Sequence, residues 1–169
     1  MRGLLRCQFK TQQWKEAADN AAELLQEKGI ASDDKMMASL VVAKNHQLNN
    51  EPDAAIAGYK LVIAAGKSEY AAESQYHIAE ILLQQNKTTE AEKAAFEVIR
   101  KMGSYDFWVT KSYVLLGDIF MKEKDLFNAE ATFKSIIENS VFPELKAEAQ
   151  QKLQQVLDEK AKSTKVEQR

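Results

Sequence analysis

The side chains that could do acid–base or metal chemistry are few and widely separated in this sequence. His46 and His77 are its two histidines, and Cys7 is its single cysteine. Zinc sites usually pair Cys and His ligands a few residues apart, so this spacing does not predict a metal centre. Asp33 and Asp34 suit the start of a helix, where the helix dipole favours negative charge. We therefore expect no catalytic residue, no metal ligand and no cofactor.

The charge balance and the N-terminus exclude further classes of function. The chain has 23 basic and 25 acidic residues and no strong basic run, so we expect no nucleic acid as partner. No apolar run approaches the length of a membrane span, and residues 1–10 lack the apolar region of a secretory signal. Arg6, directly before Cys7, argues against a lipoprotein site. We interpret Cys7 as a small apolar core residue.

Segment 113–133 shows helical spacing of large and small apolar residues. The first stripe consists of Tyr113, Leu116, Gly117 and Phe120. Ala129 and Phe133 begin a second stripe. Gly117 and Ala129 would let two antiparallel helices approach closely, while Phe120 and Phe133 fill the space beside them. The segment therefore predicts a tightly packed helix pair.

This order of residues, with a Leu-Gly pair, an aromatic residue and then Ala-x-x-x-Phe, resembles the tetratricopeptide repeat (TPR) pattern. Tyr113 stands where Trp is common, and Phe120 stands where Tyr is common. The same frame recurs upstream, at Ala79, Leu82, Ala91, Ala95 and Val98, and again at Ala43, His46, Ala55, Tyr59 and Val62. The resemblance implies an all-α, right-handed superhelical array of antiparallel helix pairs, with about 3.5 repeats.

Turn residues and helix starts divide the chain into repeats. We expect a single array over residues 1–159, with a frayed or disordered tail at 160–169. The predicted repeats are about 1–29, 33–66, 69–103 and 106–140, and a capping helix is predicted at 143–159. The predicted helices are near 2–10, 13–28, 33–48, 52–65, 69–86, 90–102, 106–124 and 126–139. Residues 3–10 look like the tail of a longer helix, so we expect a fragment of a longer array; a natural start with a short helix is the alternative.

The repeats are longer than the usual 34 residues of a TPR. Such stretched repeats are similar to those of bacterial cell-envelope proteins, namely the periplasmic Tol–Pal coordinator of cell division and the lipoprotein of the outer-membrane β-barrel assembly machine. This resemblance implies a bacterial protein, located in the periplasm or cell envelope rather than in the cytoplasm.

The resemblance also implies that the first helix of each pair lines a concave groove. The predicted partner-binding residues are Phe9, Leu40, Lys44, Tyr76, Glu80, Leu83, Val114, Asp118 and Met121. Other outward positions of these helices are Arg6, Met37, Gln47, Glu73 and Lys111. Apolar anchors with a few charges are expected where a peptide or helix docks. The alternative is that the apolar members of this set are core residues.

The sequence thus predicts a non-catalytic protein–protein interaction scaffold, not an enzyme, that binds a partner peptide or helix in its groove. We expect no membrane insertion, and the chain is a possible homo-oligomer. Two alternatives stay open. The chain could be a structural spacer or self-association domain, or an accessory domain of a larger enzyme.

Overall fold

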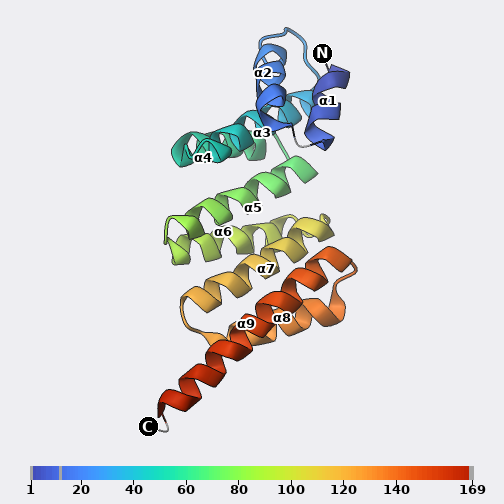
Figure 1. Ribbon diagram of the computed structural model, residues 1–169. Coiled ribbons are helices and arrows are strands. Elements are labelled where there is room, and N and C mark those ends of the chain that lie inside the picture. Colours follow the sequence, from blue (N-terminus) through green and yellow to red (C-terminus); the bar gives the residue numbers. More distant parts are fainter. Residues whose placement is uncertain (1, 12, 168–169) are drawn as a thin grey trace. The chain divides into compact units, whose positions relative to one another are not determined.

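The computed structural model describes residues 2–11 and 13–167, and every regular element in these ranges is a helix (Figure 1). The helices are α1 (Arg2–Lys10), α2 (Trp14–Leu24), α3 (Ser32–Leu48), α4 (Pro52–Ala64), α5 (Glu69–Gln84), α6 (Thr88–Lys101), α7 (Asp106–Lys122), α8 (Leu126–Asn139) and α9 (Pro143–Glu167). Short connections join them, so consecutive helices pack as pairs. The predicted all-α fold of helix pairs is confirmed.

The chain divides into two compact units, Met1–Ile81 and Leu82–Arg169, which we call the N-terminal and C-terminal units. In the N-terminal unit, α1 packs on α2, α2 on α3, and α3 on α4. In the C-terminal unit, α7 packs on α6, α8 and α9, and α8 also packs on α9. The predicted single array over residues 1–159 stays a prediction.

The α7–α8 pair is built as the apolar spacing predicts. Phe133 is fully buried, and a Cβ atom added to Gly117 would lie 2.4 Å from two carbons of the Phe133 ring. Gly117 is therefore the residue that lets α7 approach the Phe133 ring so closely. Tyr113 departs from the expected core stripe. It is 40% exposed because it borders an open cavity between the two helices.

We expect Gly117→Ala to destabilise the fold by about 1–3 kcal/mol, because the buried Phe133 ring has to move. This loss exceeds the usual gain in helix propensity on replacing glycine by alanine. Gly3→Ala is the control, since nothing lies within 4 Å of a Cβ added there. It should be neutral or stabilising by up to about 1 kcal/mol. Urea denaturation followed by circular dichroism measures both; a stable Gly117→Ala variant would contradict the close packing.

The N-terminal unit has its own core between α1, α2 and α3. Its buried members are Leu5, Ala17, Ala18, Ala21, Leu24, Met37, Ala38 and Val41. Cys7 is exposed, so its interpretation as a core residue is wrong. The reason is the direction of α1, which turns Leu5 and Gln8 inward instead. In the α3–α4 pair, Tyr59 is buried as the repeat frame predicts.

The C-terminal helix α9 continues to Glu167, beyond the predicted end near residue 159. Ion pairs to the preceding hairpin accompany this extension. Lys160 Nζ lies 2.5 Å from Glu130 Oε2 of α8, and Lys124 Nζ lies 3.3 Å from Glu159 Oε1. The predicted tail therefore includes helical residues up to 167, and its last two residues lie outside the described ranges.

The pKa of Glu130 can be measured to test whether the end of α9 packs against α8. Hydrogen bonds from Lys134 and then Lys160 lower the pKa of Glu130 to about 2, from an ordinary value of 4.5. A carboxylate whose pKa is depressed by folding stabilises the folded state above its unfolded pKa, and this contribution is lost as the pH falls toward about 2. NMR titration of the carboxyl carbon should show that midpoint, and Lys160→Gln should raise it. An unchanged midpoint in Lys160→Gln would place the end of α9 away from α8.

Candidate functional site

Three apolar residues of the predicted groove are buried in the structure. Leu40 is fully buried, Val114 is 2% exposed, and Tyr76 is 6% exposed. Val114 belongs to the core cluster of the C-terminal unit with Phe133 and the α9 residues Ala149 and Val156. The first helix of a pair also packs against helices other than its own partner. These additional helices bury positions that would be exposed to solvent in a single helix pair. The expectation that these three side chains form an accessible strip is therefore corrected.

Lys44 and Glu80 belong to a polar network inside the N-terminal unit. Lys44 Nζ lies 2.6 Å from Glu73 Oε1 and 4.4 Å from the centre of the Trp14 ring. Gln47 of α3 donates a hydrogen bond of 2.8 Å to Glu80 Oε2 of α5. The network therefore connects α3 to α5, and both Lys44 and Glu80 are already engaged within the chain.

Glu73 is the buried anion at the centre of this network. Burial alone would raise its pKa, but the hydrogen bond with His77 and the ammonium group of Lys44 outweigh burial, so the pKa of Glu73 is lowered. Burial, followed by the charges of Glu73 and Glu80, raises the pKa of Tyr59. Tyr59 is thus a neutral hydrogen-bond donor, and it donates to Gln47 Oε1 at 2.6 Å. These contacts position helices; they do not leave a reactive group open.

In the C-terminal unit, α9 occupies the face of α7 that the groove prediction used (Figure 1). Lys152 of α9 donates to both carboxylate oxygens of Asp118, at 2.7 and 2.8 Å. Burial raises the pKa of Asp118 more than the Lys152 ammonium group lowers it. Lys111 also pairs with Glu148 of α9 at 3.0 Å. Asp118 is therefore part of the attachment of the C-terminal helix.

The two remaining residues of the predicted groove in the C-terminal unit are half-buried. Met121 packs against the core cluster that contains Val114. The backbone carbonyl of Leu83 accepts a hydrogen bond of 2.9 Å from Lys122 Nζ. Leu83 and Met121 belong to the C-terminal unit, whereas Phe9 belongs to the N-terminal unit.

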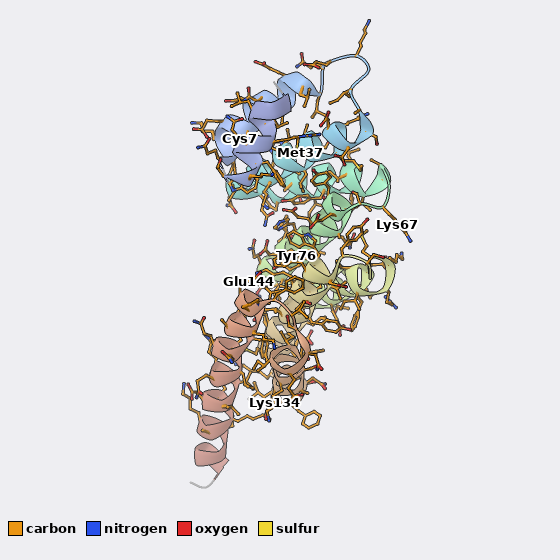
Figure 2. All side chains as sticks on the ribbon, turned by 90° about the vertical axis from the view of Figure 1, so that its right-hand side faces the viewer. Cys7, Met37, Lys67, Tyr76, Lys134 and Glu144 are labelled. Atoms are coloured by element: carbon orange, nitrogen blue, oxygen red, sulfur yellow. The ribbon has the colours of Figure 1, made fainter. Side chains whose placement is uncertain are left out.

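Phe9 lies in an open cavity of about 420 Å³ formed within the N-terminal unit. We call this cavity the α1–α3–α5 pocket. It is lined by Arg6, Phe9 and Lys10 from α1, by Asp33 and Met37 from α3, and by Glu69, Tyr70 and Glu73 from α5. Figure 2 shows the side chains of this unit, with Cys7 on α1 and Met37 on α3 labelled. The pocket thus brings together residues from α1, α3 and α5, and Phe9 is the member of the predicted partner-binding set that lines it.

The pocket combines aromatic walls with charged groups. Phe9 meets Tyr70 edge to face at 6.1 Å between ring centres, and it meets Trp14 in the same way at 5.7 Å. Arg6 donates to Asp34 Oδ1 at 2.6 Å. Arg6 was expected at an outward position and is exposed, whereas Met37 and Glu73 were also expected there and are buried. The sequence did not predict four further lining residues, because they lie at helix ends outside the repeat frame: Lys10, Asp33, Glu69 and Tyr70. The signal available for them was the aromatic Tyr70 beside the acidic Glu69.

A second open cavity, of about 580 Å³, lies between α7 and α8 in the C-terminal unit. It is lined by Val109, Thr110, Tyr113, Ala131, Thr132, Ser135, Ile136, Asn139 and Ser140. Hydroxyl, amide and apolar groups form this lining, and no acidic or basic residue contributes to it. No pattern in the sequence predicted this cavity.

Two kinds of site are absent from the described part of the chain. No group of three or more His, Cys, Asp or Glu residues there could hold a metal ion. Within the same residues, no helix combines the length and the apolar character needed to cross a membrane.

Paired helices with a small residue at the close crossing of α7 and α8 form a TPR-like fold. The structure is similar to a crystal structure of a Podosopora anserina kinesin light chain with nearly identical TPR-like repeats. The match has a TM-score of 0.60 and covers 97% of this chain and 94% of that chain, at 16% sequence identity. At this identity the similarity concerns the fold. No family model and no curated protein matches the sequence.

Proposed function

We propose that this chain is a non-catalytic scaffold whose α1–α3–α5 pocket binds a segment of a partner protein. The observation behind this proposal is that three first helices contribute half-buried aromatic rings and charged groups to one open pocket. TPR-like repeats typically bind protein partners, and their fold is generally non-enzymatic. A few anchor residues in such a pocket supply most of the binding energy in protein interfaces.

The proposed binding surface includes only residues whose side chains are accessible in the pocket. Phe9 and Tyr70 are half-buried, and Lys10 is exposed at the end of α1. Leu40, Tyr76 and Val114 support the helices from inside, and Lys44 and Glu80 hold α3 to α5. We retain the groove of the first helices as the proposed docking surface, now centred on Phe9. The repeat lengths still favour a bacterial envelope protein, as part of the proposal.

A pair of matched double variants tests this assignment. Phe9→Ser with Tyr70→Ser removes both pocket rings, whereas Tyr113→Ser with Phe127→Ser makes the same changes at exposed positions, 40% and 75% exposed, in the C-terminal unit. We expect the first variant to lose partner capture by about tenfold or more. The second should keep it. Quantitative pull-down with mass spectrometry measures capture, after circular dichroism has shown that both variants are folded.

Equal capture by both variants would contradict the pocket as the docking site. Capture lost only in the Tyr113→Ser and Phe127→Ser variant would move the site to the C-terminal unit.

Self-association is the second candidate, favoured by exposed apolar residues outside the pocket. Phe127 is 75% exposed on α8, and Val141 is 79% exposed in the connection to α9. Phe127 lies in the first turn of α8 and Val141 follows its last turn, so each would make its own contact with a second copy of the chain. Sedimentation equilibrium should show a dimer that Phe127→Ser disrupts if this candidate is correct, and a monomer in both proteins if it is wrong.

A further inference from the structure

We infer that the α1–α3–α5 pocket receives the positively charged side chain of an arginine or lysine in the partner segment. This inference rests on the proposed function of the same pocket and names the chemistry that the pocket selects.

The charges of the pocket leave two acidic groups open. Arg6 is paired with Asp34 at 2.6 Å, and Glu73 is paired with Lys44 at 2.6 Å, so these two lining groups are already compensated. The remaining charged lining residues are Lys10, Asp33 and Glu69, all exposed. Asp33 and Glu69 form no ion pair with any described residue. Asp33 acts on Arg6 only through its charge, as one of the causes that raise the pKa of Arg6. An incoming cation would therefore find two exposed carboxylates that form no ion pair with a described residue.

The electrostatic surroundings of Tyr70 agree with this arrangement. Burial raises the pKa of the Tyr70 hydroxyl, and the negative charges of Asp33, Glu69 and Glu73 raise it further, against the opposing charge of Arg6. The three carboxylates together therefore raise the pKa of Tyr70 more than the guanidinium group of Arg6 lowers it.

The aromatic walls suit the same ligand. Ring faces attract cations, and an arginine or lysine stem can pack along apolar surface while its charged end reaches a carboxylate. This chain already makes such a contact, because the ammonium group of Lys44 lies 4.4 Å from the centre of the Trp14 ring. Phe9 and Tyr70, which are half-buried, offer the apolar surface in the pocket. A neutral or acidic side chain would leave the carboxylates of Asp33 and Glu69 uncompensated.

Helix-dipole stabilisation is a competing reason for acidic residues at these two positions, because Asp33 and Glu69 lie in the first turns of α3 and α5. Asp53 and Glu90 occupy the same kind of position in α4 and α6, outside the pocket lining. They supply a matched control, since both are exposed like the pocket pair.

Short random peptides displayed on phage and selected on the full chain provide the test. We expect the selected peptides to be enriched in arginine or lysine. Fluorescence anisotropy should show that Asp33→Asn with Glu69→Gln weakens a selected peptide by about tenfold, while Asp53→Asn with Glu90→Gln changes its Kd by less than about twofold. Replacing the basic residue of the peptide by norleucine should cause a similar loss, and higher salt should weaken binding to the unaltered chain.

Two results would overturn the inference in different ways. Peptides that lose binding to the Phe9→Ser and Tyr70→Ser variant, yet have no basic preference and tolerate Asp33→Asn with Glu69→Gln, would refute the cation but keep the proposed function. Peptides that bind this aromatic variant normally, or a selection that yields no binding peptide, would contradict both.

Discussion

Phe133→Ala should lower the free energy of unfolding of the C-terminal unit by about 3–5 kcal/mol. The Phe133 ring is fully buried between Gly117, Ala129 and the rest of the cluster that α9 completes. Removing the ring leaves a cavity that close-packed helices fill only in part. Phe127→Ala is the control in the same helix, because Phe127 is 75% exposed, and it should change stability by less than about 0.5 kcal/mol.

The two tryptophans let each unit be followed separately. Trp108 lies in the C-terminal unit and Trp14 in the N-terminal unit. Urea denaturation in a Trp14→Phe background, followed by the fluorescence of Trp108, measures the effect of Phe133→Ala where it arises. If Phe133→Ala and Phe127→Ala unfold at the same urea concentration, the repeat register derived from Gly117 and Phe133 is wrong.

Lys44→Met should destabilise the N-terminal unit by about 3–5 kcal/mol at neutral pH, because it leaves the buried Glu73 without its main cation. The Glu73 side chain is 8% exposed, and its pKa is lowered by His77 and Lys44 against the effect of burial. Without Lys44, the pKa of Glu73 should rise. The penalty should therefore shrink as the pH falls and Glu73 becomes protonated.

Two controls separate the buried charge from a general effect of losing a lysine. Glu73→Gln in the Lys44→Met background removes the uncompensated anion and should restore part of the stability. Lys124→Met breaks an exposed pair with Glu159, where the side chains are 73% and 37% exposed, and should cost at most about 1 kcal/mol. Urea denaturation at several pH values measures each variant. Trp14 fluorescence in a Trp108→Phe background follows the Lys44→Met variants, and Trp108 fluorescence in a Trp14→Phe background follows Lys124→Met. A penalty independent of pH would show that Lys44 acts through packing rather than charge.

The helix pairs could be predicted from the sequence because their signals are local. Apolar spacing placed eight helices near their observed bounds, and small residues at a fixed place in each repeat predicted the close crossing at Gly117. The end of α9 was less predictable. Its last turns lack an apolar stripe, and the partners of Lys160 and Glu159 lie about thirty residues away in sequence, as far as neighbouring repeats are apart.

The accessible site could be predicted only in part. Phe9 and Arg6 were predicted at outward positions, and both line the pocket with accessible side chains. Met37 and Glu73 were predicted at outward positions too, but they contribute to the pocket lining as buried residues. Tyr70 could not be assigned to that pocket, because its edge-to-face contact joins α1 to α5, and three helices separate these two in the sequence.

The sequence by itself determined the helices, the pairing of neighbours and the class of repeat, because these depend on spacing within one or two turns and on side-chain size. Tertiary structure decided which outward residues stay accessible. Leu40, Tyr76 and Val114 are buried, and Asp118 is held by Lys152 of α9, whereas Phe9 lines an open pocket. Exposure depends on every helix that packs against a position, and those neighbours are distant in sequence.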